Sequence, residues 1–376
     1  MGLSFELLRE VSTEHGVARR GRLETPHGVV ETPAFLPVGT LGAVKGLSAP
    51  ALEEAGAEIM LANLYHLALR PGVDVIESLG GLHAFSGWTR PLLSDSGGYQ
   101  IFSLSETRRI DDAGVTFRSV HDGSPMRFTP ESVVADQRRL GVDLAMVLDE
   151  CPPWPIAKEQ AIAALRRTRE WARRSAEEDA RRSVAGGLFG IVQGSFFEDL
   201  RERAALELRE LPFAGFAIGG VSVGEASSLG REVVRRVVPL LPAERPRYLM
   251  GLGTLEDLRH GISAGVDLFD CVLPSRNARH GFLFTRAGVV RIKNARYQRD
   301  PAPIADDCDC TTCRRHSRAF LHHLFRAREI TGKVLATVHN VRVYLDFMER
   351  TRKALELGSL ESEAFGMPAL RRDGAP

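Results

Sequence analysis

Eight short apolar runs recur along the chain, and most of them precede a stretch with helical periodicity. The runs span residues 34–38, 59–64, 91–93, 144–148, 188–192, 215–218, 248–252 and 266–269. Helical patterns span 49–55, 130–140, 156–183, 197–211, 224–238 and 255–264. Strands that alternate with helices over about 250 residues are typical of a (β/α)8 barrel. A doubly wound open sheet is the rival, but no glycine-rich phosphate fingerprint follows the first run. We therefore predict an α/β fold of the (β/α)8 class.

The remaining segments decorate this barrel. The whole chain, 1–376, is predicted to form one barrel domain that starts with a β-hairpin region, whose turn is at Pro26-His27-Gly28. Residues 116–120 and 126–128 flank another turn, which predicts a hairpin inserted at the barrel mouth. Its role, as a lid or as a mere excursion, stays open. After the last run, 281–292 alternates like a strand pair, and about 295–345 is predicted to be a zinc-binding subdomain.

That subdomain is predicted from three clustered cysteines, Cys308, Cys310 and Cys313. Three thiolates within six residues need one more ligand to bind a tetrahedral Zn²⁺ ion. We favour His339, because it follows a strand-like segment, 334–338, that could return to the cluster; His322 and His323 are the alternatives. Four protein ligands would make this one structural ion per subunit.

Charge and hydropathy limit the cellular location expected for the protein and the kinds of partner it can bind. The formal net charge is +1, so any nucleic-acid surface has to be local. Residues 271–350 provide it, with 15 Lys and Arg against 7 Asp and Glu. No apolar run approaches the roughly 18 residues of a membrane span. The N-terminus does not have the layout of a signal peptide and the cysteines are odd in number, so we expect no membrane association and a cytoplasmic location.

Candidate site residues lie at the ends of six of the predicted strands: three aspartates, a glutamine, a methionine and a glycine with an exposed backbone. In a (β/α)8 barrel the reactive groups lie at the carboxyl ends of the strands. Each such residue taken alone is explained as a helix cap or a turn former. Together they predict one site with several carboxylates, which allows nucleophilic and acid–base roles to be divided in displacement at a sugar C1′. The residues are Asp95, Asp149, Gln193, Gly220, Met250 and Asp270.

The stretch 265–281 joins this site to the basic region. Asp270 ends the eighth strand, Pro274 is expected to break the structure, and Arg276 and Arg279 follow in a loop. A carboxylate beside arginines indicates chemistry on a substrate that carries phosphate.

These motifs resemble the tRNA-guanine transglycosylase family over about residues 5–355. The matching segments are SDSGGYQ at 94–100, DEC at 149–151, QG at 193–194, AIGG at 217–220 with VGE at 223–225, YLMG at 248–251, DLFDCVLP at 267–274 and the Cys-x-Cys-x-x-Cys…His set. The resemblance implies a pentosyltransferase of queuosine biosynthesis that exchanges guanine at the wobble position of tRNAs with GUN anticodons for a 7-deazaguanine base. It also implies tRNA as a partner and a homodimer.

The resemblance further implies a role for each site residue. Asp270 would be the nucleophile in a covalent intermediate, and Asp95 the general acid/base. Asp149, Gln193 and the Gly220 amide would bind the polar edges of the base, and Tyr99 and Met250 would sandwich it. Arg276 and Arg279 would hold RNA phosphates. Cys151 and Val223 resemble the bacterial pocket, which takes preQ1, whereas Val221 replaces the usual leucine; queuine use stays an alternative.

Two rivals come from other classes. A non-catalytic tRNA-binding relative is disfavoured because both Asp95 and Asp270 are present. A metal-dependent barrel hydrolase would need histidines at strand ends, and none of those considered carries one.

Overall fold

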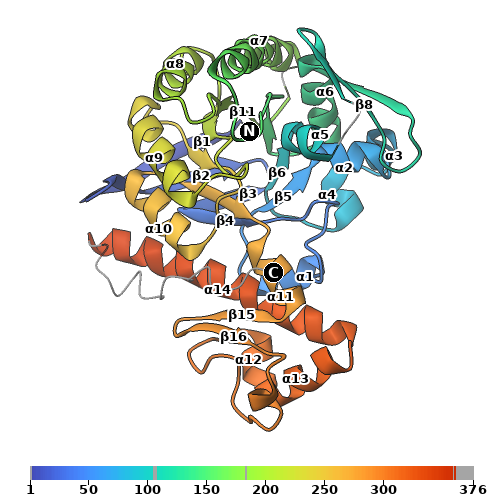
Figure 1. The fold of residues 1–376 in the computed structure, drawn as a ribbon, viewed down its shortest axis with the longest axis vertical. Helices are drawn as coiled ribbons and strands as arrows, with labels where there is room; N and C mark the ends of the chain where they lie inside the picture. Colours follow the sequence, from blue (N-terminus) through green and yellow to red (C-terminus); the bar gives the residue numbers. More distant parts are fainter. Residues whose placement is uncertain (1, 105–107, 183, 359, 361–376) are drawn as a thin grey trace.

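A parallel eight-stranded barrel forms the centre of the molecule (Figure 1). The computed structural model describes residues 2–104, 108–182, 184–358 and 360. Going round the sheet, the order is β4-β14-β13-β12-β11-β10-β6-β5, and a parallel bridge between Val38 and Leu61 joins the two outer strands. The (β/α)8 prediction is therefore confirmed. The strands are β4 (Ala34–Pro37), β5 (Met60–Asn63), β6 (Leu92–Asp95), β10 (Leu144–Met146), β11 (Gly187–Val192), β12 (Gly215–Ile218), β13 (Arg247–Leu249) and β14 (Leu268–Cys271).

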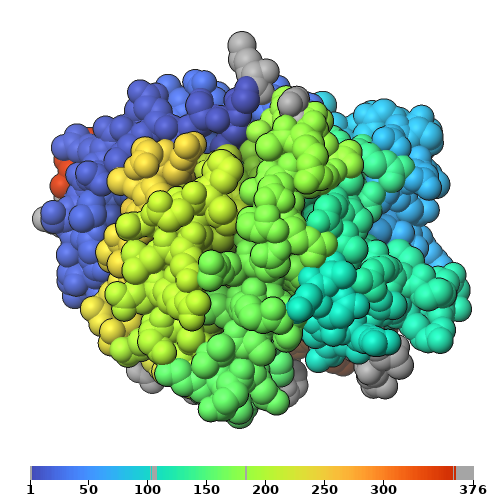
Figure 2. All heavy atoms as spheres, turned by 90° about the horizontal axis from the view of Figure 1, so that it is seen from above, coloured from blue at the N-terminus to red at the C-terminus, as the bar shows by residue number. Residues whose placement is uncertain are grey.

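Helices cover the outside of the barrel, and all six predicted helices are present. Two of them have the same first and last residues as predicted, Pro130–Leu140 and Leu255–Ala264. Capping boxes at Thr129 and Thr254 begin these helices, and a glycine ends each of them. Figure 2 shows successive segments side by side on the surface, from yellow through green to teal. The helices are α1 (Ala49–Glu54), α2 (Leu64–Leu69), α3 (Val73–Ser78), α4 (Gly81–Ser86), α5 (Gly98–Leu104), α6 (Pro130–Leu140), α7 (Lys158–Arg182), α8 (Glu198–Leu208), α9 (Ser227–Val237) with η1 (Val238–Leu240), and α10 (Leu255–Ala264).

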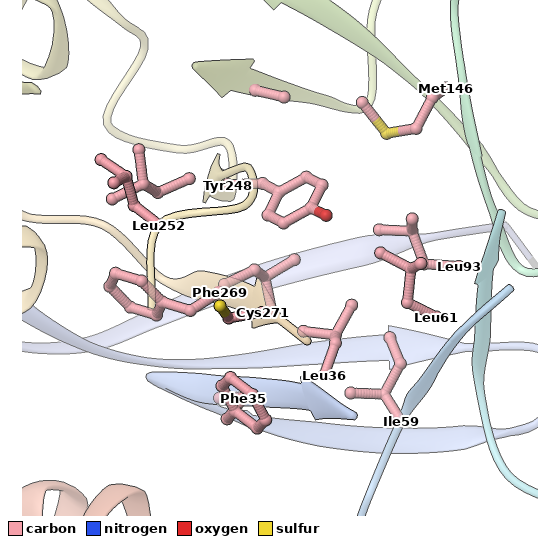
Figure 3. Packing of buried hydrophobic residues seen from close by; sticks show 14 of the residues in the cluster. Phe35, Leu36, Ile59, Leu61, Leu93, Met146, Tyr248, Leu252, Phe269 and Cys271 are labelled. Carbon is pink, nitrogen blue, oxygen red and sulfur yellow. The ribbon is translucent and has the colours of Figure 1, made fainter. Parts of the chain in front are cut away.

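The barrel interior is a packed apolar core. All six residues of β11 are buried, as expected for a parallel strand covered on both faces. Figure 3 shows Leu36, Leu61 and Leu93 gathered between the strands, with the Tyr248 ring beside them and its hydroxyl pointing inward. These buried apolar side chains form a rigid base for the polar groups at the ends of the strands.

A three-stranded sheet lies against the barrel and is tied to it through Asp143. The sheet comprises β1 (Ser4–Thr13), β2 (Gly16–Thr25) and β3 (Gly28–Thr32), and it confirms the predicted hairpin. Asp143 is 1% exposed. It accepts from the backbone N–H groups of His27 and Leu92 at 3.1 and 2.8 Å, and both the His27 and His83 rings contact it, at 2.8 and 3.3 Å. One carboxylate therefore joins the β2–β3 turn, α4 and the start of β6.

The predicted insert is a three-stranded sheet, not a two-stranded hairpin. The predicted pair, β8 (Gly114–Arg118) and β9 (Pro125–Phe128), is joined by β7 (Arg109–Asp111). The Phe117 ring packs 5.4 Å from the ring of Tyr65 on α2. The insert is therefore anchored to the barrel by apolar packing.

The C-terminal part forms a lobe beside the barrel, along which α14 runs (Figure 1). The prediction of a strand-like segment at 334–338 is wrong, since these residues lie inside α14. Burial against both the barrel and the lobe overrides the β-branched composition of the segment. Pro274 likewise begins a helix where a loop was expected. The elements are α11 (Leu273–His280), β15 (Phe282–Thr285), β16 (Gly288–Arg291), η2 (Ala295–Tyr297), α12 (Thr311–Arg315), α13 (Arg318–Arg326) and α14 (Ile330–Leu357).

Candidate active site

A cavity of about 640 Å³ opens at the carboxyl ends of the barrel strands. It brings together the predicted site residues from six strands and the segments after them. Arg279 is the one predicted contact that does not line it. The predicted residues in its wall are Asp95, Tyr99, Asp149, Cys151, Gln193, Gly220, Val221, Val223, Met250, Asp270 and Arg276.

Asp270 is held rigidly at the end of β14. Its Oδ1 atom accepts hydrogen bonds from the Tyr248 hydroxyl at 2.6 Å and from the Gly251 amide at 2.9 Å. Burial raises the pKa of Asp270, while these two hydrogen bonds lower it by stabilising the carboxylate. Both hydrogen bonds are made to Oδ1, and Asp270 lines the cavity.

Asp95 ends β6 and has a different environment. The Asn63 amide donates to its Oδ2 at 2.8 Å. Burial, reinforced by the nearby charges of Asp149 and Asp270, raises the pKa of Asp95 to about 7. A carboxyl group with this pKa can both give and take a proton near neutral pH, as a general acid/base must.

Asp149 and Gln193 form a polar pair on the floor of the cavity. The Gln193 amide nitrogen donates to Oδ2 of Asp149 at 2.6 Å, and Gln193 Oε1 has no hydrogen-bond partner among the described residues. Burial raises the pKa of Asp149 to about 6, and the hydrogen bond from Gln193 opposes the rise. A carboxylate and a carboxamide fixed side by side suit a flat ligand that has both hydrogen-bond donors and acceptors.

Apolar and aromatic groups complete the walls. Tyr99, on α5, is 47% exposed and lines the mouth with Met250. Cys151 and Val221 lie deeper, 6% and 0% exposed. Such walls provide flat contact surfaces for an aromatic ring, with the polar groups fixing its orientation.

The two arginines differ in placement although they are one turn apart on α11. Arg276 is exposed and lines the cavity. Arg279 is half-buried, and its buried Nη1 atom has no hydrogen-bond partner in the part of the chain that the structure describes. Burial lowers the pKa of Arg279, and the neighbouring charge of Arg276 adds to this.

Three contributors were missed by the sequence reasoning: Asn63, Tyr248 and Arg201. Asn63 bridges Asp95 and Gln100, and Tyr248 supports Asp270. A signal was present for the first two, since both lie in predicted strands that end at the same mouth. Arg201 lies in α8, where the sequence offers nothing to separate it from its exposed neighbours.

The four predicted zinc ligands form a cluster that could hold a metal ion. Nδ1 of His339 lies 3.5, 3.7 and 3.3 Å from the sulfurs of Cys308, Cys310 and Cys313. Tetrahedral Zn²⁺ with bonds of ~2.0–2.3 Å separates its ligands by roughly 3.6 Å, so the donors fit. His339 Nε2 contacts the Phe284 carbonyl at 2.7 Å, which fixes the ring. The alternative His322 bonds to the Ile292 carbonyl instead.

None of the helices in the described ranges has the length and apolarity to cross a membrane.

Comparison with known proteins gives matches along nearly the whole chain. A family model described as queuine tRNA-ribosyltransferase matches residues 14–365. A queuine tRNA-ribosyltransferase of Aromatoleum aromaticum is 49% identical over 373 residues, which cover 99% of this chain and 100% of the relative. Relatives of the same name from Desulforudis audaxviator and Marinobacter nauticus are 50% and 46% identical over 355 and 374 residues. These matches cover 94% and 100% of this chain, and 95% and 99% of the relatives.

Proposed function

The chain belongs to the queuine tRNA-ribosyltransferase family, and from this membership and its cavity we propose that it exchanges a tRNA guanine for preQ1. Membership makes it a tRNA ribosyltransferase of the queuosine pathway. The finer proposal is exchange at the wobble position of tRNAs with GUN anticodons, through a covalent intermediate. One observation carries it: three carboxylates at the carboxyl ends of three strands, Asp95, Asp149 and Asp270, line one cavity in three different environments.

The proposed reaction is a double displacement. Asp270 Oδ2 attacks C1′ of the ribose while the bond from C1′ to guanine N9 breaks, and Asp95 gives its proton to the departing base. The incoming base then loses its N9 proton to Asp95. Its nitrogen attacks C1′, and the bond to Asp270 breaks. The rigid hold on Asp270 and the pKa of about 7 for Asp95 suit these two roles.

Base recognition follows from the polar pair. Asp149 would accept from the N1–H and exocyclic amine of guanine, while Gln193 and the Gly220 amide would donate to the carbonyl. Adenine presents the opposite pattern and would leave buried groups unpaired. Tyr99 and Met250 would sandwich the ring, and Cys151 and Val221 would bound its substituent. The target base has to leave the tRNA stack to enter such a cavity.

The remaining contacts are assigned to RNA, metal and a second subunit. Arg276 and Arg279 would hold phosphates beside the flipped nucleotide. The cysteine cluster with His339 would hold one structural Zn²⁺ ion, which when bound cross-links α12 to α14. We propose the zinc-binding subdomain, about 295–345, as the part that supports RNA docking and a homodimer. A cytoplasmic location completes the proposal.

The covalent step is tested by trapping tRNA on the protein and separating the adduct on a denaturing gel. Asp270→Asn should abolish the adduct, whereas Asp199→Asn, at an exposed ion pair with Lys158, should leave it unchanged. An undiminished adduct in Asp270→Asn would remove Asp270 from its role. Exchange of labelled guanine, competed separately by preQ1 and queuine, tests the choice of base. Stronger competition by queuine would overturn the preQ1 assignment.

A further inference from the structure

Arg201 is a buried arginine that lies under two loops of the cavity. It projects from α8 and is 2% exposed. The loop after β11 carries Gln193, and the loop after β12 carries Gly220. Gln193 and Gly220 line the cavity, whereas Arg201 does not. Any effect it has on the ligand must therefore pass through these loops.

Four hydrogen bonds attach the guanidinium to backbone carbonyls of both loops. Nε donates to Ser195 at 2.6 Å. Nη1 donates to both Val192 and Gly219 at 2.8 Å, and Nη2 donates to Gly220 at 3.1 Å. No carboxylate among the described residues forms an ion pair with Arg201. Burial lowers its pKa to about 10, which leaves it charged at neutral pH. A buried cation held only by carbonyls is costly unless those carbonyls stay in place.

The attachment fixes the direction of one amide. The peptide bond between Gly219 and Gly220 is planar, so the Gly219 carbonyl and the Gly220 N–H point in opposite directions. Because Arg201 binds the carbonyl, the Gly220 N–H points away from the guanidinium, and both Gly219 and Gly220 line the cavity. Free rotation of this peptide would present the carbonyl, an acceptor, in place of the donor.

Close packing couples the same peptide to Gln193. A Cβ at Gly220, where φ is +64°, would lie 2.4 Å from Gln193 Oε1 and 3.3 Å from Arg201 Nη2. A Cβ at Gly194 would lie 2.9 Å from the Arg201 backbone nitrogen. Ser195 has φ +52°, an unusual value for a residue with a side chain, and its carbonyl takes the shortest of the four hydrogen bonds. The two loops and Arg201 thus form one packed unit.

We propose that Arg201 is a positioning residue that presents the Gly220 N–H and the Gln193 amide to the base. This inference rests on the proposed function, since it assigns both donors to the carbonyl edge of the base. It makes Arg201 a determinant of base affinity and not of tRNA affinity.

The test is the effect of Arg201→Met and Arg201→Lys on KM for guanine and on KM for tRNA. Arg201→Met should raise KM for guanine about tenfold or more, as expected when a hydrogen bond to the base is lost, and should change KM for tRNA less than about twofold. Arg201→Lys keeps the positive charge but loses the several N–H donors of the guanidinium. Its KM for guanine should therefore lie between those of the wild type and Arg201→Met. Arg203→Met is the control, because Arg203 lies on the same helix and pairs with Glu207 at the surface.

A purely structural role gives a different pattern. Partial unfolding lowers the concentration of active enzyme, and so the maximal rate, without changing KM for guanine. An unchanged KM for guanine, or an equal rise in both KM values, overturns the inference. If Arg201→Met does not fold, Arg201→Lys decides. Guanine binding to the free protein is measured by calorimetry in parallel. A wild-type protein that binds guanine without exchanging it overturns the proposed function alone, and the affinities of the variants still test Arg201.

Discussion

Tyr248→Phe removes the hydroxyl that donates to Asp270 Oδ1 at 2.6 Å and leaves the buried ring in place. A hydrogen bond to a charged acceptor contributes about 1.5–3 kcal/mol. Its loss disfavours the carboxylate and raises the pKa of Asp270 further, in the direction in which burial already raises it. Since ~1.4 kcal/mol corresponds to one pKa unit, the acidic limb of the pH–rate profile should move up by about one to two pH units.

The assay is guanine exchange under kcat conditions from pH 5 to pH 9. At low pH the variant should be slower by about tenfold or more, because less Asp270 is ionised. At high pH the deficit should shrink, because Asp270 is then ionised in both proteins.

Tyr344→Phe is the matched control for this experiment. Tyr344 is also fully buried, and its hydroxyl donates to the Gly253 carbonyl at 2.8 Å. Its loss should lower the free energy of unfolding by about 1 kcal/mol and leave the acidic limb in place. An acidic limb that stays fixed in Tyr248→Phe, or that moves equally in both variants, would refute the reasoning.

Three further predictions concern the metal cluster, the Asp143 clamp and the RNA contacts. His339→Ala should reduce zinc content, measured by mass spectrometry, from one ion per chain to none and lower Tm, whereas Cys151→Ser should keep the ion; bound zinc in His339→Ala would contradict the ligand set. Asp143→Asn should lower the free energy of unfolding at pH 7 by about 1–3 kcal/mol. Although burial raises the pKa of Asp143, hydrogen bonds from His83, the Leu92 amide and His27 outweigh it and hold the pKa below its usual range. The wild-type advantage is therefore complete above the unfolded-state pKa of about 4 and shrinks as pH falls below it; urea titrations that show a gap independent of pH would exclude this linkage. Arg276→Met should weaken tRNA binding and reduce the slope of log K against log salt by about 0.7, whereas Arg203→Met should not; equal slopes would remove Arg276 from the phosphate contacts.

Local pattern was sufficient for the architecture. Buried parallel strands have continuous apolar runs, and capping residues begin and end helices, so all eight strands and the exact bounds of α6 and α10 could be predicted. Because parallel strands end at one mouth, the meeting of Asp95, Asp149 and Asp270 followed from their positions alone. The spacing of Cys308, Cys310 and Cys313 likewise predicted a metal site.

Contacts between segments far apart in the sequence could not be predicted from local pattern. The segment 334–338 has a strand-like composition, yet packing on both sides makes it part of α14, and helical geometry brings His339 to the cysteines. Tyr248 reaches Asp270 because it pairs with Leu268 across β13 and β14, and residues two apart on a strand share a face.

The sequence by itself determined the barrel, the ends of its strands and the chemistry gathered there. Tertiary structure alone decided which neighbours tune that chemistry: the hydroxyl on Asp270, the amide on Asp95 and the guanidinium under the Gly219–Gly220 peptide. The physical reason is that periodicity and capping are properties of neighbours in sequence. Hydrogen bonds across the barrel depend instead on strand register and on burial, which exist only once the sheet has closed.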